Sequence, residues 1–412
     1  MQRFIGEHDQ PAAKKRALGL IFMIMLLDII GLTIIIPVAP FIVQRFSSDA
    51  FMVTALTGIY AAAQFLAAPA IGKISDRVGR RPVLLVCVFG SAIGYFIFGV
   101  GGALWVLLLA RVIDGISGGN MSTAGAYIAD ISTPEERPAN FGLIGMAFGL
   151  GFIVGPALGG ALSQISIDAP AFAAGVLALA SVALIYAWLP ESLPPARRQA
   201  APMRAADFNP LGAIAEIARK PGVATLLLAT CVFAFAFDGM NSALSVYLAS
   251  QFAAQPWQIG ALFVVSGLVT AVMQAALVPR VVARMGERRM AVVSQIGLSL
   301  GALVIALAPA LWWLYPNVVL ISGVGGFVWA TTGSLLAGKV RQHEQGQLAG
   351  VSTALQSLMT ACGPLAAGLI YDSVAPSAPF WLSAALFLLA GALLLRVRVP
   401  ATREAAGAAQ SA

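Results

Sequence analysis

The stretch IGKISDRVGRRPVLL, Ile71–Leu85, lies between two long apolar segments and guides the interpretation of the whole chain. It holds five of the eight charged residues between positions 17 and 110. A related stretch, VPRVVARMGERRMAV, occupies Val278–Val292, so that Gly79 corresponds to Gly286 at an offset of 207 residues. Self-similarity at a fixed offset indicates internal duplication. The sequence therefore predicts two related halves.

The composition places most of the chain in a lipid bilayer. Apolar residues make up 59% of the 412 residues and charged residues only 10%, and the mean hydropathy is +0.86. This balance excludes a soluble enzyme core. The net charge of +7 is spread over short basic clusters between apolar runs, which is typical of topology signals and not of a nucleic-acid surface. Cys87, Cys231 and Cys362 are too far apart in sequence to suggest a metal or redox pair.

Apolar runs long enough to cross a membrane recur along the chain and predict an all-α membrane protein with twelve transmembrane helices in two pseudo-symmetric six-helix bundles. The first run is too long for a signal peptide, so we expect it to remain as a span. The predicted spans are 17–43, 51–72, 82–101, 103–128, 139–163, 171–189, 222–249, 258–279, 290–309, 312–337, 347–370 and 378–396.

The distribution of Lys and Arg predicts the topology. With twelve spans, the termini and even-numbered loops hold 23 of the 25 basic residues. The positive-inside rule then places both termini in the cytoplasm, and we expect a multi-pass protein of the cell (inner) membrane. The proline-rich segment 190–221 is predicted to be a cytoplasmic linker between bundles at 1–189 and 222–412.

Four motifs make this sequence similar to one known family across its whole length. The chain resembles the major facilitator superfamily, and within it the twelve-span drug:proton antiporters close to the tetracycline efflux proteins. The resemblance implies a secondary active transporter that works by alternating access, and it favours a transporter over an enzyme. The motifs are LDIIGLTIIIPVAP at 27–40, GKISDRVGRRPVLL at 72–85, LLLARVIDGISGG at 107–119 and GLGFIVGPALGG at 149–160.

In this family the loop between spans 2 and 3 forms a charged gating network at the cytoplasmic mouth. We expect a glycine-assisted turn there whose carboxylate and guanidinium groups pair with the end of span 4. The alternative is that the arginines are only topology anchors. The second copy carries Ala283 and Glu287 where the first has Asp76 and Arg80, which predicts a weaker latch. The candidate gating residues are Gly72, Asp76, Arg77, Gly79, Arg80, Arg81 and Asp130.

Span 5 resembles the helix motif associated with antiporters. Glycines four residues apart allow close helix packing, and a proline removes one backbone hydrogen bond. From the residues alone, close packing without a conformational role is an equal alternative. The motif residues are Gly151, Gly155, Pro156, Gly159 and Gly160.

Four ionisable residues are predicted at membrane depth: Asp28, Arg111, Asp114 and Asp238. Such residues are costly in a bilayer and are therefore candidates for proton coupling or substrate binding. Arg111 and Asp114 are three residues apart and can also be a purely structural pair. Asp28 and Asp238 are 210 residues apart and have no such partner nearby in sequence.

The resemblance places spans 1, 4, 7 and 10 around a central cavity for an amphiphilic substrate. Each of the expected lining residues has ordinary helix packing as its alternative. They are Gln64, Asn120, Phe233, Phe237, Asn241, Tyr247 and Trp329.

The expected partners are protons, the lipid bilayer and a lipophilic or amphiphilic small molecule, with no metal, organic cofactor or nucleic acid. A transporter of a metabolite or lipid with different coupling remains an alternative within the same fold, and a membrane-embedded enzyme or receptor is the alternative outside it. The sequence leaves the oligomeric state open. It also departs from the tetracycline exporters at Gly94, Thr270 and Leu298, where those proteins carry acidic or imidazole groups. This departure predicts a preference for metal-free compounds.

Overall fold

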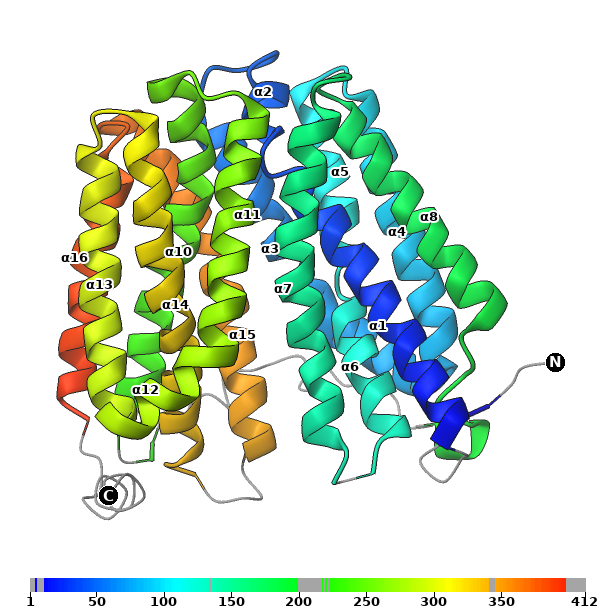
Figure 1. Cartoon of the computed structure of the whole chain (residues 1–412). Coiled ribbons are helices and arrows are strands. Elements are labelled where there is room, and N and C mark those ends of the chain that lie inside the picture. Colours follow the sequence, from blue (N-terminus) through cyan, green and yellow to red (C-terminus); the bar gives the residue numbers. More distant parts are fainter. Residues whose placement is uncertain are drawn as a thin grey trace. The chain divides into compact units, whose positions relative to one another are not determined.

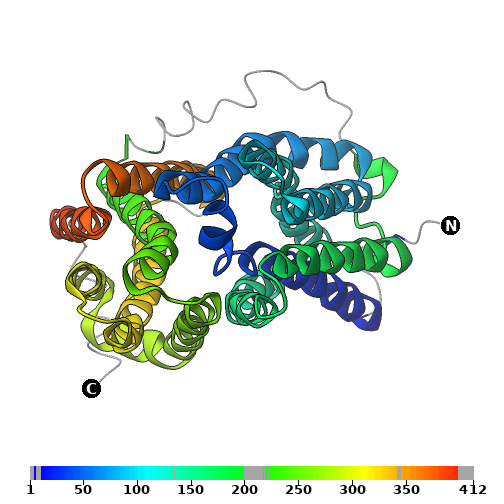
Figure 2. The same ribbon diagram turned by 90° about the horizontal axis from the view of Figure 1, so that it is seen from above.

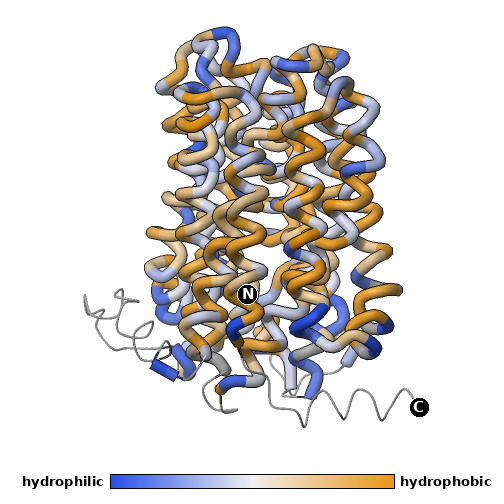
Figure 3. The backbone as a smooth tube through the Cα atoms, turned by 90° about the vertical axis from the view of Figure 1, so that its left-hand side faces the viewer, coloured by the Kyte–Doolittle hydropathy of each residue, from blue (hydrophilic) through white to orange (hydrophobic). Residues whose placement is uncertain are grey.

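The computed structural model of the chain describes residues 4–5, 11–133, 135–198, 217, 219–220, 222–340 and 345–397 (Figure 1). Within these residues the regular structure is helical, apart from one isolated bridge between Phe4 and Glu191. Part of the linker predicted at 190–221, namely 199–216, 218 and 221, lies outside the described residues. Figure 3 shows hydrophobic residues along most of the helix lengths and hydrophilic residues gathered near their ends.

Eight α-helices form the first half of the described chain. Their bounds are α1 Pro11–Thr33, α2 Ala39–Val43, α3 Ala50–Val78, α4 Arg80–Val100, α5 Leu104–Ser117, α6 Asn120–Ile131, α7 Arg137–Leu162 and α8 Ala169–Trp188.

The second half is also helical. Its elements are α10 Val223–Phe252, α11 Pro256–Val272, the π-helical turn η3 Met273–Leu277, α12 Val278–Met285, α13 Glu287–Leu307, α14 Leu314–Ala337, α15 Gln345–Ser373 and α16 Ala378–Leu395. Short 3₁₀ turns occur at η1 Pro195–Arg197 and η4 Leu311–Trp313.

Eleven helical stretches of the described chain are long and apolar enough to span a bilayer, with α5 and α6 counted together as Leu104–Ile131. The eighth predicted span differs, because α11 has only 17 residues before the π-helical turn. Pro279 has no backbone N–H to donate to the preceding turn, and the Arg280 side chain donates to the Ala276 carbonyl at 2.5 Å. With this interrupted helix the fold has twelve membrane-spanning helices, as the sequence predicted.

The chain divides into two compact units. Unit 1 comprises the described residues within Met1–Ser48, Ile59–Phe208 and Gln255–Val264, and unit 2 those within Asp49–Gly58, Asn209–Ala254 and Val265–Ala412. The start of α3 therefore groups with unit 2, and the start of α11 with unit 1.

The two units repeat the same helix pairings. In unit 1, α1 packs beside α7 and α8, and α4 packs against α5 and α8 (Figures 1 and 2). In unit 2, α10 packs against α15 and α16, and α13 against α14 and α16. The interior of unit 1 includes the fully buried rings of Tyr127 and Phe98, and that of unit 2 includes Phe380 and Phe387. This agreement matches the internal duplication seen in the sequence.

Candidate functional site

A polar site inside unit 1 is built around Asp28, in the second half of α1. The Asn120 amide, at the first residue of α6, donates to Oδ2 of Asp28 at 3.3 Å. Asn120 is only 4% exposed, and Asp28 is partly buried. The partner of this membrane-depth carboxyl is therefore a neutral amide.

The ion pair of Arg111 and Asp114 lies beside Asp28. Nη1 of Arg111 is 3.2 Å from Oδ2 of Asp114, and both side chains are at most 5% exposed. The guanidinium carbon lies 4.7 Å from the centre of the Phe98 ring and 5.5 Å from that of Tyr95, which stabilises the cation within the helix bundle. Asp114 also accepts hydrogen bonds from Tyr95 and Ser91 and repels Asp28 electrostatically. The structure thus brings three of the four predicted ionisable residues into one site.

Gln64 supports this site from α3. Its side-chain amide donates to the Gly118 carbonyl at 2.9 Å, where α5 ends, and lies 3.4 Å from the Tyr60 hydroxyl. A Cβ at Gly118 would lie 2.6 Å from that hydroxyl and 3.0 Å from the Gln64 amide nitrogen, so a larger residue here would displace these two side chains. Tyr60 and Tyr95 were not among the predicted site residues, because a tyrosine in an apolar run gives no sequence signal of a polar role.

Asp238 lies in α10 of unit 2. Its Oδ2 accepts a hydrogen bond of 2.7 Å from the Thr360 hydroxyl of α15. Asn241, one turn further along, donates to the Phe237 carbonyl at 2.8 Å. Both Asp238 and Asn241 are partly exposed.

Two predicted lining residues pack inside unit 2 instead. Phe233 is fully buried, with its ring centre 5.0 Å from that of Trp329. Tyr247 is 6% exposed and stacks edge-on against Phe380 at 4.8 Å. Large rings on the buried faces of α10 fill the helix bundle, which corrects the prediction for these two. Phe237 is partly exposed, and Trp329 is 37% exposed.

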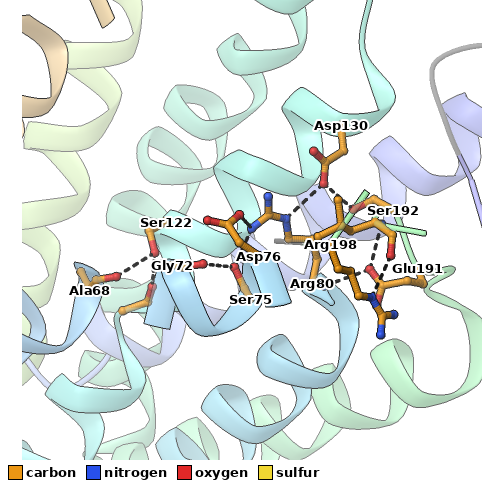
Figure 4. A network of polar contacts seen from close by, with 12 residues as sticks. Ala68, Gly72, Ser75, Asp76, Arg80, Ser122, Asp130, Glu191, Ser192 and Arg198 are labelled. Atoms are coloured by element: carbon orange, nitrogen blue, oxygen red, sulfur yellow. Dashed lines mark hydrogen bonds and ion pairs between the residues drawn. The ribbon is translucent and has the colours of Figure 1, made fainter. Parts of the chain in front are cut away.

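The predicted gating residues form a charged network in unit 1 around Arg80 (Figure 4). Nη1 of Arg80 is 2.5 Å from Oδ1 of Asp76, and Nε is 3.1 Å from Oδ2 of Asp130. The same guanidinium donates to Oγ of Ser75, which in turn donates to the Gly72 carbonyl. Arg80 thus joins the ends of α3 and α6. Arg77 is partly buried on the last turn of α3.

Sequence analysis missed Glu191, which lies at the start of the predicted linker. This residue is fully buried, and its carboxylate accepts hydrogen bonds from the backbone N–H groups of Arg80, Arg81 and Leu193 at 2.9, 3.2 and 3.0 Å. Two of these N–H groups belong to the first two residues of α4 and have no acceptor within their own helix. Glu191 accepts their hydrogen bonds, and its negative charge lies at the positive end of the α4 dipole. Only the tertiary fold brings residue 191 to this helix.

The glycine motif of α7 packs against α1. A Cβ at Gly151 would collide with Ile29, one at Gly155 with Thr33 and one at Gly159 with the Ile34 carbonyl. The Thr33 hydroxyl also donates to the Gly151 carbonyl at 2.9 Å.

The far end of the same motif contacts the start of α11. A Cβ at Gly160 would lie 2.9 Å from Cα of Trp257, and one at Gly260 would lie 2.5 Å from the Pro156 carbonyl oxygen. The motif therefore allows two helices to approach α7.

Gly94 lies directly against Asp114. A Cβ built on Gly94 would be 3.1 Å from Cβ of Asp114 and 3.1 Å from the Ala110 carbonyl. Position 94 therefore lies beside the Asp114 side chain of α5. Leu298 of α13 is fully buried, and Thr270 of α11 is partly buried.

The sequence-family model of the Major Facilitator Superfamily matches residues 21–273 and 226–411, which together span nearly the whole chain. The chain belongs to the Major Facilitator Superfamily. It is therefore a multi-pass membrane transporter and not an enzyme, and its fold consists of two pseudo-symmetric six-helix bundles.

Individual relatives agree with this family. The class C tetracycline resistance protein of Escherichia coli is 33% identical over 393 residues, which cover 95% of this chain and 97% of that protein. The crystal structure of the human organic anion transporter MFSD10 (TETRAN) has a TM-score of 0.70 and 27% identity, covering 94% of this chain and all of that one. An inward-facing, occupied bacterial homologue of the lysosomal transporter Spinster has a TM-score of 0.75 over 94% of this chain and 97% of its own, and at 17% identity it shows the fold alone. The chain is thus a secondary transporter related to tetracycline efflux proteins and MFSD10.

Proposed function

We propose that this protein exports lipophilic or amphiphilic small molecules in exchange for protons. The observation that carries the proposal is the buried site of unit 1, where Asp28 faces the neutral amide of Asn120 and Asp114 faces Arg111. Proton uptake by Asp28 neutralises a carboxyl for which the described residues show no ion pair, whereas Asp114 keeps its counter-charge. Asp28 is therefore the proposed proton carrier, and Arg111 with Asp114 sets its electrostatic surroundings.

In this proposal the residues that recognise the substrate lie in unit 2. Asp238 has a hydroxyl partner from Thr360, and Asn241, Phe237 and Trp329 keep part of their surface exposed. A carboxyl with amide and aromatic neighbours suits an amphiphile with a polar or cationic group. The relationship to tetracycline resistance proteins supports a drug-like substrate.

A second candidate is the transport of organic anions. Among the described residues, Nε and Nη2 of Arg111 have no hydrogen-bond partner, and an anion beside them would accept hydrogen bonds from these two donors. The related MFSD10 structure is that of an organic anion transporter. The two candidate functions are distinguished by whether the transported compound is an anion.

The proposed moving parts are the bundles 1–189 and 222–412, joined by the linker 190–221. The cytoplasmic location of both termini, in the cell membrane, rests on the basic residues of the loops. The Arg80 network is proposed to close the cytoplasmic end, and the α7 motif to hold α1 during the movement.

The test uses the purified protein in proteoliposomes with an imposed pH gradient. Asp28→Asn keeps the shape and the hydrogen bonding of the side chain but cannot release a proton. We expect gradient-driven transport to fall at least about tenfold, while exchange of substrate without a gradient continues, because only the coupling step is lost. Neutral, cationic and anionic fluorescent compounds are compared in parallel.

The matched control is Asp168→Asn, which makes the same change at the exposed pair of Asp168 with Arg45. This control should transport like the parent protein. Normal gradient-driven transport by Asp28→Asn would contradict the proposal, and transport of anions alone would favour the second candidate.

A further inference from the structure

The hydroxyl group of Thr360, in α15, has two acceptors within reach. Its oxygen lies 2.7 Å from Oδ2 of Asp238 in α10 and 3.1 Å from the backbone carbonyl oxygen of Gln356, one turn earlier in α15. A hydroxyl carries one hydrogen and two lone pairs, so it donates fully to only one of these oxygens at a time. An ionised carboxylate is the stronger acceptor of the two. A second acceptor is therefore ready for the hydroxyl whenever Asp238 takes another partner.

Close packing of α10 against α15 holds this pair together inside unit 2. A Cβ at Gly239, the residue after Asp238, would lie 2.9 Å from the Gly363 carbonyl oxygen. A Cβ at Gly363 would in turn lie 2.6 Å from the Phe235 carbonyl oxygen. The two backbones can approach this closely only because neither glycine has a side chain. Short side chains at positions 238 and 360 therefore meet directly.

The pair is accessible to a small molecule. Asp238, Thr360 and Gln356 are each partly exposed, and so is the ring of Phe237. In the described part of the chain, the hydroxyl of Thr360 supplies the hydrogen bond that Asp238 accepts. An ionised carboxylate can accept about four hydrogen bonds. Most of its acceptor capacity is therefore left for a ligand.

The hydroxyl beside the carboxyl is particular to unit 2. Asp28 occupies the matching position in unit 1, and an offset of 208 residues aligns the Gly-Pro pairs of α7 and α15. The same offset places Phe152 at the position of Thr360, and α7 contains no serine or threonine. The two repeated carboxyls are therefore equipped for different partners.

Two neighbouring oxygens suit a cation that carries two N–H donors. When such an ammonium group donates to Asp238, the Thr360 hydroxyl can turn its hydrogen to the Gln356 carbonyl and accept the second N–H with a lone pair. Hydrogen bonds from a charged donor are short and strong. A tertiary ammonium has one N–H and can use Asp238 alone, and a quaternary ammonium has none.

We propose that Thr360 makes the Asp238 site selective for lipophilic compounds with a primary or secondary ammonium group. The inference rests on the proposed role of Asp238 in substrate recognition and adds the class of cation that this carboxyl takes. Asp238 supplies the negative charge, and Thr360 supplies the second acceptor. The apolar part of the compound has the partly exposed ring of Phe237 beside it.

The test measures equilibrium binding to the purified, full-length protein in detergent at about neutral pH. The probes are naphthylethylamine and its monomethyl, dimethyl and trimethyl derivatives at the nitrogen, which are all positively charged under these conditions. Isothermal titration calorimetry gives the Kd of each compound. Thr360→Val removes the hydroxyl, and Thr360→Ser keeps it. The matched control is Thr230→Val, because the Thr230 hydroxyl, also in unit 2, donates to the Leu226 carbonyl of its own helix.

In the parent protein we expect the secondary amine to bind about fivefold more tightly than the tertiary amine, since one charge-assisted hydrogen bond is lost between them. Thr360→Val should reduce this ratio to less than about twofold and leave the affinity for the tertiary amine unchanged. A purely structural role of Thr360 would instead weaken the binding of all four compounds alike. Thr360→Ser and Thr230→Val should keep the parent ratio.

An unchanged ratio in Thr360→Val would overturn the proposal, as would equal affinities of the parent for the secondary and tertiary amines or no binding of any of the four. Asp238→Asn separates this inference from the proposed function. If this variant binds the amines like the parent, Asp238 does not recognise the substrate and both proposals fail. If it loses them while Thr360→Val keeps the parent ratio, only the inference about Thr360 fails.

Discussion

The two copies of the repeated loop share a backbone and differ in their charges. Gly79, before α4, has φ 116° and ψ 157°, and Gly286, before α13, has φ 78° and ψ 151°. The arginine two residues after each glycine makes the same kind of contact in both copies. Arg81 donates to the carbonyls of Ile185 and Tyr186 at the end of α8, and Arg288 to those of Leu394 and Leu395 at the end of α16.

The surroundings of the two turns are different. A Cβ at Gly79 would collide with the Glu191 carboxylate, whereas one at Gly286 would meet nothing within 4 Å. Arg80 joins Asp76 and Asp130, while Glu287, at the matching position, accepts a hydrogen bond from the Ser334 hydroxyl. Duplication has therefore kept the turn and the helix cap in both halves, but the buried charge network belongs to one.

The largest expected difference in stability is that between the variants Arg80→Gln and Glu287→Gln, which change matching positions of the two loops. Arg80→Gln leaves the Asp76 and Asp130 carboxylates without their shared cation and should destabilise the protein by about 2 kcal/mol, a value reduced because both are partly exposed. Glu287→Gln should change stability by less than about 0.5 kcal/mol. Thermal unfolding in detergent and transport rates of both variants check this. Equal losses would show that the two loops are equivalent.

A smaller difference in stability is expected between the variants Gly79→Ala and Gly286→Ala. Both substitutions force an alanine into a backbone conformation that costs about 1–3 kcal/mol. Gly79→Ala should cost about 1–2 kcal/mol more, because the new methyl group displaces Glu191 from the N–H groups of α4. The drop in unfolding temperature of each variant measures the extra cost. A greater loss from Gly286→Ala would refute the role given to Glu191.

The smallest difference in stability is expected between the variants Arg81→Lys and Arg288→Lys. Each removes a two-pronged contact with the carbonyl end of a helix, and a lysine ammonium cannot reproduce that planar fork. Both should lose about 1 kcal/mol of stability, with no difference between them. Parallel denaturation of the two variants tests this equality. Loss of transport in Arg81→Lys alone would place Arg81 in the charge network as well.

Much of the site was predictable because its chemistry stands out against an apolar background. Asp28, Arg111 and Asp114 were conspicuous as charges inside predicted spans, and all three lie in one site. The pairing of Asp76, Arg80 and Asp130 followed from the motif. Residues whose types are common in spans or loops, such as Tyr95 and Glu191, carried no such signal.

The sequence by itself determined the membrane environment, the number of spans and the duplication, because the hydrophobic effect acts on local runs of side chains and leaves a pattern along the chain. Tertiary structure alone decided which side chains meet. It buried Phe233 and Tyr247, brought Asp114 against Gly94, placed Glu191 at the start of α4 and set Thr360 against Asp238. Each of these contacts joins residues of different segments of the chain, and their distance in space follows from how the helices pack and not from their separation in the sequence.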